Sequence, residues 1–438
     1  MNSSSDVTCS AARYAVTRRS ALGLAAAGLA AAGLATTPGV SAQAHAGPAD
    51  PGPADPGPAD PGRRGMVAKL PAPTGPHRIG TVSTRLVDTS RRDPWVKSVP
   101  YRELMISVWY PAAGTSGGAG HPLAAYMAPG AAERWNATAP HGIPEDAIDF
   151  AALRTHAREG APADMSEGRR PVLLYASGAN DPRTWGTSLV EELASRGYVV
   201  VTIDHTYEAP GVQFPDGSVK DDAPLRKAFA DAQQSGTVPA LLKKVLDVRV
   251  ADSKFVTDRL GALPNGLSEV VDRRRVGMLG QSAGGVAAAE TMYEDRRVKA
   301  GLNMDGTLEH NPEPNGTNLT PVARHGLTGP FLLMGREGSD RTTEPSWRAF
   351  WTHSTGWKRN LTLRGSMHQT YTDLSALLPQ AGVGREVVEE HLGTVDPGRA
   401  ITAIRSYPTS FFDRWLRGDD DHLLDGPSGR HPDVEFAG

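Results

Sequence analysis

The stretch VGMLGQSAGG, residues 276–285, decides the predicted fold. Its centre is the G-x-S-x-G pattern GQSAG at residues 280–284, with Ser282 in the middle. In proteins that use this pattern, the serine sits on a sharp, strained turn between a buried strand and a helix. A short apolar run precedes the motif, and the small-residue segment AGGVAAAETMY (283–293) follows it with helical composition. Because both neighbours are present, we interpret Ser282 as a nucleophile rather than as a serine without function in a glycine-rich turn.

Strands and helices are predicted to alternate along much of the remaining chain. Short apolar runs predict strands at 104–110, 171–177, 199–205, 274–280, 298–305, 329–335 and 359–365. Helical segments lie between several of these strands, for example at 186–198 and at 239–263, where apolar residues recur at helical spacing. Continuous apolar strands that alternate with helices predict an α/β fold with a mostly parallel central sheet and helices on both faces.

Three regions are expected in order along the chain. Residues 1–46 contain Arg18 and Arg19 before an apolar run and a small-residue segment, which predicts a twin-arginine-type signal and therefore a secreted protein. Residues 47–65 contain a Gly, Pro, Ala and Asp repeat that is typical of an extended linker. Residues 66–438 are expected to form the catalytic domain, with insertions near 111–168 and 206–238.

Composition and motifs exclude several classes of function. The formal net charge is −3 and no long basic run is present, so nucleic acid is not an expected partner. The sequence has no H-E-x-x-H and no C-x-x-C motif, and its single cysteine, Cys9, lies in the predicted signal. We therefore expect neither a metal nor a cofactor.

A serine nucleophile needs a histidine base and an acid, which follow it in the order Ser, acid, His in enzymes that carry this motif. His368 comes directly after the last predicted buried strand, whereas the other histidines downstream of Ser282 do not follow such a strand immediately. Two carboxylates are candidates for the acid. Asp305 ends the strand after the motif helix, and Asp340 follows the next strand.

The negative oxygen of the reaction intermediate must be stabilised by two backbone N–H groups. One belongs to the residue after the nucleophile, which is Ala283. The other is expected in the loop after the strand at 171–177, where Gly178, Ala179 and Asn180 follow in order. We favour Ala179 for this second amide.

Several segments, taken as an ordered set, resemble the platelet-activating factor acetylhydrolase-like α/β-hydrolases. They are PVLLYASGANDPRTWGTSLVEELASRGYVVVTIDH (171–205), GQSAGG (280–285), LNMDG (302–306) and LRGSMHQTYTD (363–373). DPWVKSVPYRELMISVWYP (93–111) is similar to that family's opening strand, so the likeness covers most of residues 80–375.

This resemblance implies an α/β-hydrolase fold, and it favours Asp305 over Asp340 as the acid. It carries the family's serine to Ser282, its histidine to His368, and its oxyanion amides to Ala179 and Ala283. The family often has a histidine before the glycine of the oxyanion loop, where this chain has Ser177.

The leading hypothesis is a secreted serine esterase without a cofactor that cleaves short to medium acyl esters, including acetyl or acyl groups of phospholipids. Its substrate would be a small-molecule or lipid ester, with transient contact to a lipid surface as a further option. One alternative is a cutinase- or lipase-like hydrolase of polyesters or lipids that uses Asp340 as the acid. In that case Trp347, Phe350 and Trp351 either line an open groove or pack as a buried helix face. An alternative of another class is a non-catalytic binding protein with this fold.

Overall fold

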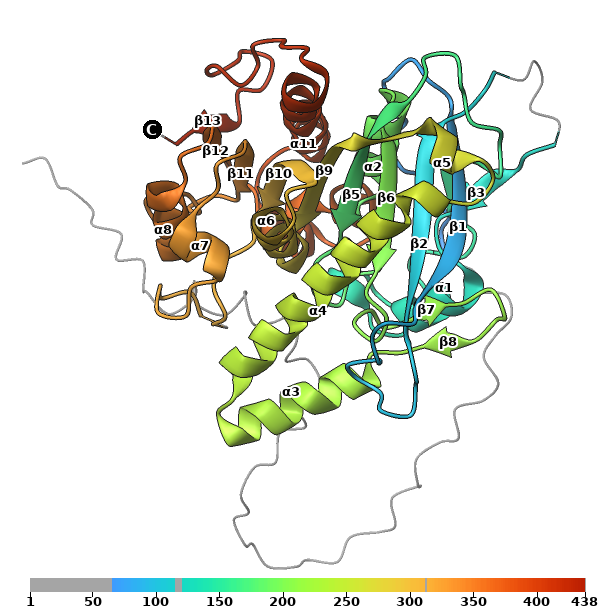
Figure 1. Cartoon of the computed structure of the whole chain (residues 1–438), viewed down its shortest axis with the longest axis horizontal. Helices are drawn as coiled ribbons and strands as arrows, with labels where there is room; N and C mark the ends of the chain where they lie inside the picture. The colour runs from blue at the N-terminus through green and yellow to red at the C-terminus, as the bar shows by residue number, and fades with distance from the viewer. Residues whose placement is uncertain (1–64, 115–119, 312, 438) are drawn as a thin grey trace, which may run out of the picture.

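The computed structural model describes residues 65–114, 120–311 and 313–437. The predicted signal at 1–46 and nearly all of the predicted linker at 47–65 therefore lie outside the described residues. An eleven-stranded sheet forms the centre, in the order β13-β12-β11-β10-β9-β5-β6-β2-β1-β4-β3 (Figure 1). Its strands are β1 (Ile79–Asp88), β2 (Arg102–Pro111), β3 (Leu123–Ala125), β4 (Arg154–Glu159), β5 (Arg170–Ala176), β6 (Val199–Asp204), β9 (Val271–Gln281), β10 (Val298–Met304), β11 (Phe331–Gly335), β12 (Lys358–Leu363) and β13 (Val434–Phe436).

The described helices connect these strands or follow them. They are α1 (Pro129–Asn136), α2 (Thr187–Ser195), α3 (Ala223–Ser235), α4 (Val238–Arg259), α5 (Leu267–Val270), α6 (Ala283–Glu294), α7 (Pro321–His325), α8 (Pro345–His353), α9 (Leu374–Leu377), α10 (Arg385–Leu392) and α11 (Pro397–Phe412). Shorter turns are η1 (Pro140–Gly142), η2 (Leu260–Ala262), η3 (His368–Tyr371), η4 (Leu378–Gln380) and the π-helical η5 (Asp413–Arg417), and β7 (Val212–Gln213) pairs with β8 (Val219–Lys220).

Six neighbouring strands at the centre of the sheet are parallel, namely β6, β5, β9, β10, β11 and β12. They are buried because helices cover both faces of the sheet. Leu174 of β5 packs with residues of α4 and α6 on one face, whereas Leu173 packs with residues of α2 and α11 on the other. Side chains of one strand alternate between faces, so β5 contributes to two separate cores. Figure 1 shows α4 and α6 in front of the strands, with α3 leading into the N-terminal end of α4. The predicted α/β-hydrolase architecture is confirmed.

The predicted central strands and the motif helix are present, but the N-terminal edge of the sheet is larger than expected. The strand expected at 104–110 lies within β2, and it is preceded by β1, which the sequence analysis did not predict. The segment 111–168 contains α1 together with β3 and β4, and these strands extend the sheet beyond β1. The segment 206–238 contains the β7–β8 hairpin and α3.

The aromatic residues of α8 belong mainly to the core. Trp347 and Phe350 are 1% and 0% exposed, and Phe350 packs on Phe331 with ring centroids 5.2 Å apart. Trp351 is half-buried and lies under the cationic groups of Arg341 and Lys358. The three rings therefore do not form an open groove.

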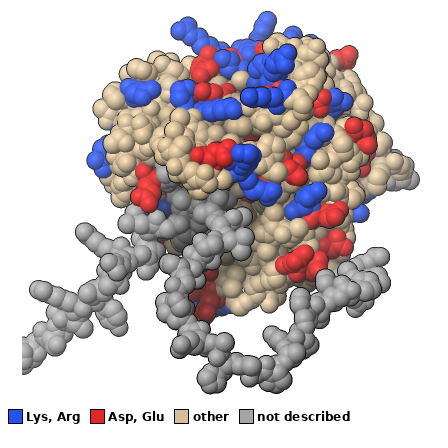
Figure 2. All heavy atoms as spheres, turned by 90° about the horizontal axis from the view of Figure 1, so that it is seen from below, with Lys and Arg blue, Asp and Glu red and all other residues tan. Residues whose placement is uncertain are grey.

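Among the described residues, no helix combines the length and the apolar character that a membrane crossing requires. Lys and Arg lie interspersed with Asp and Glu over much of the face shown in Figure 2.

Burial of Glu290 on α6 leads to a prediction about stability. Burial raises the pKa of Glu290 from 4.5 to about 7, and Glu294 adds to this rise. Between pH 4.5 and 7 the unfolded chain therefore ionises this carboxyl before the folded chain does, so folded stability falls as pH rises. We expect the melting temperature of Glu290→Gln, relative to wild type, to increase from pH 4 to pH 7 and then to level off.

Thermal unfolding followed by circular dichroism between pH 4 and 8.5 measures this difference. Glu133→Gln is the control, because Glu133 is exposed on α1 and does not contribute to the raised pKa of Glu290. A Glu290→Gln difference that stays constant over this pH range would contradict the assignment of a raised pKa.

Candidate active site

Ser282 occupies a strained turn between β9 and α6. Its backbone has φ 53° and ψ −124°, a conformation that non-glycine residues adopt rarely and at an energetic cost. The Ser282 amide donates to the Met304 carbonyl at the end of β10 with an N···O distance of 2.8 Å. This bond fixes the turn to the neighbouring strand, so the serine lies at the carboxyl edge of the sheet.

Two glycines allow the backbone around Ser282 to pack closely. A Cβ atom on Gly284 would lie 1.9 Å from the Ala176 carbonyl oxygen at the end of β5. A Cβ atom on Gly280 would lie 2.4 Å from the Gly284 carbonyl carbon and 2.5 Å from the same Ala176 oxygen. Real Cβ contacts do not reach these distances, so each position needs glycine for a steric reason. The close packing joins the turn at Ser282 to the loop that follows β5.

A methyl group at Gly284 is therefore expected to disrupt this turn. We predict that Gly284→Ala lowers the free energy of unfolding by about 3 kcal/mol or more and abolishes ester hydrolysis, because the carbonyl of a core strand must move. Urea denaturation and an activated-ester assay measure the two effects. Gly429→Ala is the control, since Gly429 is exposed and has no atom within 4 Å of its Cβ position. A Gly284→Ala protein with wild-type stability would contradict the steric explanation.

The structure brings His368 and Asp305 together at the same edge of the sheet. The imidazole Nδ1 of His368 lies 2.6 Å from Oδ2 of Asp305. His368 begins η3, directly after β12 and its turn, and Asp305 directly follows β10. The carboxyl ends of β10 and β12, which lie on either side of β11 in the parallel sheet, therefore place residues 63 positions apart in contact.

Asp305 is held in place by backbone and side-chain groups. Its φ is 56°, and its own amide donates to the Met334 carbonyl at 2.8 Å. Its Oδ1 accepts from the Arg336 amide at 3.1 Å, and the Arg336 Nε lies 3.5 Å from Oδ2. With a side chain only 4% exposed, the carboxylate has a fixed direction toward His368.

Asp340, the other candidate acid, has different partners. Its Oδ1 accepts from the amides of Thr342 and Thr343 at 2.6 and 3.0 Å and from the Thr342 hydroxyl at 2.6 Å. These bonds cap a turn after β11, an ordinary role for Asp, and they lower the pKa of Asp340. No hydrogen bond joins Asp340 to His368 in the described part of the chain.

The two aspartates therefore lead to opposite expectations. Asp305→Asn should lower kcat roughly 10³- to 10⁴-fold, because an amide at this position favours the wrong imidazole tautomer. Asp340→Asn should leave kcat within about twofold of wild type, because its bonds stabilise a local turn. Steady-state hydrolysis of an activated ester by both variants decides between them. A large loss in Asp340→Asn alone would reverse the assignment of the acid.

Gln281 contacts His368 and was not singled out by the sequence analysis. Its Nε2 lies 3.1 Å from His368 Nε2 and 3.3 Å from the His368 carbonyl oxygen. An amide NH₂ group is only a donor, so this contact indicates that His368 Nε2 is an acceptor and that Nδ1 carries the proton toward Asp305. The position of Gln281 directly before Ser282 could have marked it as a site residue. Its contact with His368, 87 residues away, follows only from the fold.

The loop after β5 lies against the candidate nucleophile. A Cβ on Gly178 would lie 3.5 Å from Ser282 Cβ and 2.5 Å from Gln281 Oε1. Ala179 follows Gly178 in this loop, and Ala283 is the first residue of α6. The amides of Ala179 and Ala283 donate to no acceptor among the residues that the structure describes. Ala179 is thus next in sequence to a residue that lies against Ser282, and Ala283 is next to Ser282 itself.

Side-chain contacts hold the loop after β5 in place. The Ser177 hydroxyl donates to the Asp181 carbonyl oxygen at 2.8 Å, so the residue that departs from the family pattern closes the loop on itself. The Asp181 Oδ1 lies 3.0 Å from Nε2 of His141, which comes from the segment 111–168. His141 also stacks on Trp185, with ring centroids 5.8 Å apart.

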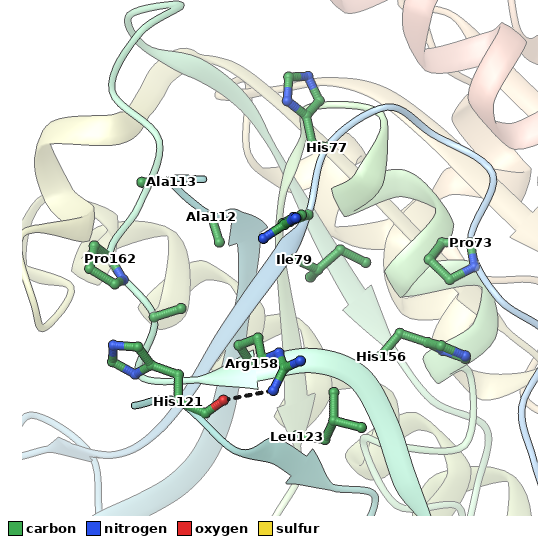
Figure 3. Close-up of a pocket in the computed structure, with 12 residues that line it drawn as sticks. Pro73, His77, Ile79, Ala112, Ala113, His121, Leu123, His156, Arg158 and Pro162 are labelled. Carbon is green, nitrogen blue, oxygen red and sulfur yellow. Dashed lines mark hydrogen bonds between the residues drawn. The ribbon is translucent and has the colours of Figure 1, made fainter. Parts of the chain in front are cut away.

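A cavity of about 420 Å³ lies at the opposite end of the sheet, where β1 starts and β2 ends (Figure 3). His77, His121, His156 and Arg158 are among its lining residues. Several of these polar groups bond within the protein, since Arg158 donates to the His121 carbonyl at 3.0 Å and His156 Nδ1 lies 2.8 Å from Glu191. None of the predicted site residues lines this cavity.

One described group of side chains has spacing suitable for a metal ion. Asp420, His422 and Asp425 place their ligand atoms within 4.8 Å of one another, and all three residues are exposed. The guanidinium of Arg414 lies 3.3 Å from Asp420 and 2.9 Å from Asp425, so it already balances their charge. This group belongs to the loop after η5 and not to the candidate active site.

Comparisons with known proteins identify esterases as relatives. No family model matches the chain. A solved structure of a ferulic acid esterase from Streptomyces cinnamoneus is 36% identical in sequence with a TM-score of 0.69, and the match covers 85% of this chain and 100% of that chain.

Two further relatives are described as acetyl-ester hydrolases. A probable 1-alkyl-2-acetylglycerophosphocholine esterase from Arthroderma benhamiae is 28% identical over 396 residues, which cover 84% of this chain and 93% of the relative. A platelet-activating factor acetylhydrolase from Gallus gallus is 21% identical over 294 residues, which cover 58% of this chain and 65% of the relative.

Proposed function

This chain belongs to the platelet-activating factor acetylhydrolase-like family of α/β-hydrolases and is a serine-type esterase, and we propose that it is a secreted enzyme that hydrolyses short to medium acyl esters through Ser282, His368 and Asp305. A small-molecule ester or the acetyl or acyl group of a phospholipid is the proposed substrate. The pairing of His368 with Asp305 at 2.6 Å, at the sheet edge that carries the strained Ser282, is the observation that supports this proposal most.

The proposed reaction begins with attack of the Ser282 hydroxyl oxygen on the ester carbonyl carbon. His368 Nε2 takes the hydroxyl proton, while Asp305 stabilises the resulting imidazolium through Nδ1. For this transfer, His368 Nε2 exchanges the Gln281 amide for the serine hydroxyl. The amides of Ala179 and Ala283 donate to the negative oxygen of the tetrahedral intermediate.

Collapse of the intermediate breaks the bond to the alcohol, which leaves with the proton from His368. A water molecule then attacks the acyl-serine, and His368 takes one of its protons. The second tetrahedral intermediate releases the carboxylic acid and returns the proton to Ser282. Atoms and charges balance over the two steps with water as the only co-reactant.

The proposal of secretion depends on the sequence at 1–46, and the proposed linker occupies 47–65. The catalytic domain is proposed at 66–438, a range that includes the sheet and its helices. Within it, the segments 111–168 and 206–238 are proposed to shape the substrate pocket. Contact with a lipid surface is proposed for phospholipid substrates and not for soluble esters.

A second candidate substrate class is an ester of a hydroxycinnamic acid. It is favoured by the 36% identity to the ferulic acid esterase, which extends over the full length of that solved chain. Both classes use the same attack by Ser282, because they differ only in the acyl group that is transferred.

The substrate class is tested with p-nitrophenyl esters from acetyl to palmitoyl, together with methyl ferulate. We expect the highest kcat/KM with acyl chains of two to about eight carbons, and a loss of at least about 10³-fold for Ser282→Ala. A higher kcat/KM with methyl ferulate than with the acetyl ester would select the second class.

The control for folding is circular dichroism of Ser282→Ala, and labelling by a fluorophosphonate probe identifies the reactive serine. Unchanged hydrolysis by folded Ser282→Ala would contradict the proposed nucleophile. Preference for palmitoyl esters in emulsion would contradict the proposed chain length.

A further inference from the structure

Arg249 of α4 reaches the loop that carries one of the proposed oxyanion amides. Its side chain is 1% exposed, and its guanidinium donates through two nitrogens to two successive carbonyls of the loop. The distances are 2.6 Å to the Ser177 oxygen and 3.0 Å to the Gly178 oxygen. A planar guanidinium can hold two acceptors in a fixed relative direction, which a lysine ammonium cannot do.

These two bonds determine where the neighbouring N–H groups point. Each peptide unit is planar and trans, so its N–H points opposite to its C=O. With the Ser177 and Gly178 carbonyls directed at Arg249, the amides of Gly178 and Ala179 point away from Arg249. A Cβ built on Gly178 would lie 3.5 Å from the Cβ of Ser282, so the loop lies against the nucleophile at this residue, and we infer that the two N–H groups point to that side. Successive N–H groups that point the same way form a concave site suited to an anion.

One buried carboxylate, that of Glu208, holds Arg249 itself. Its Nε donates to Glu208 Oε2 at 2.7 Å, and Glu208 is 2% exposed, so a buried charge has a buried counter-charge. One turn further along α4, Asp252 accepts from Arg102 of β2 at 2.8 Å and lies 3.0 Å from His205 Nδ1. The helix is therefore anchored to the sheet beside the residue that contacts the loop.

We propose that Arg249, supported by Glu208, is a positioning residue that sets the direction of the Ala179 amide and so stabilises the transition state of ester hydrolysis. Arg249 does not touch the substrate in this proposal, and its effect passes through the peptide between Gly178 and Ala179. The inference rests on the proposed function, because it concerns the oxyanion of that reaction.

The test separates transition-state stabilisation from stability of the fold. Arg249→Lys keeps the charge near Glu208 but loses the two-carbonyl fork. We expect kcat to fall about 10- to 100-fold with KM within threefold, since loss of one oxyanion donor costs about 10²- to 10³-fold and misdirection costs less. A trifluoromethyl ketone with the acyl group of the best p-nitrophenyl substrate forms an oxyanion on serine. Its inhibition constant should rise by the same factor as kcat/KM falls.

Arg405→Lys is the matched control. Arg405 is 7% exposed and donates to three backbone carbonyls, those of Ser188, Ala72 and Pro71, away from the oxyanion loop. We expect this variant to lose melting temperature while keeping kcat and the ketone inhibition constant within twofold. Glu208→Gln, which keeps an acceptor for Arg249 and removes the counter-charge, should lower kcat threefold to tenfold with a matching rise in the inhibition constant.

Folded Arg249→Lys with wild-type kcat and inhibition constant would overturn the proposal. If Arg249→Lys does not fold, an unchanged kcat and inhibition constant in folded Glu208→Gln would overturn it. Both results require active wild-type enzyme, so they leave the proposed function intact. Absence of any ester turnover and of a fluorophosphonate adduct in folded wild-type protein would instead overturn the proposed function and this inference with it.

Discussion

Close backbone packing between Gly284 and the Ala176 carbonyl is the constraint on which the candidate site depends. A Cβ on Gly284 would lie only 1.9 Å from the Ala176 oxygen, because the start of α6 packs directly against the end of β5. Because of that approach, the turn at Ser282 and the loop at Gly178 share one corner of the sheet. The two proposed oxyanion amides come from these segments, which are about a hundred residues apart in the chain.

Buried charged side chains hold the groups at this corner of the sheet in place. Asp305 directs His368, and Arg249 with Glu208 directs the loop carbonyls, so charged groups act on both halves of the site without facing bulk solvent. Leaving one member of such a pair alone would be costly, because a buried charge without its partner loses solvation. The resulting rigidity suits a reaction in which the oxygen charge develops at a fixed position.

The strands near the motif were predictable because parallel strands buried on both faces have continuous apolar sequences. β1 was missed because its residues alternate between buried and exposed and include several polar side chains. His368 and Asp305 were identified as candidates by their positions after strands and by resemblance, although Asp305 and Asp340 looked alike locally. Arg249 gave no signal, since a charged residue on a long helix normally indicates a solvated face.

The segment 111–168 meets the loop after β5 through the contact of His141 with Asp181, and stacking of His141 on Trp185 supports this contact. The closely packed glycine turn admits no added side chain, whereas this side-chain contact can be exchanged without moving a core strand. New substrate preferences can therefore arise in evolution by replacing surface segments around a reaction centre whose backbone stays the same. The same division tells a protein engineer where sequence libraries are tolerated and where they would mostly yield unfolded chains.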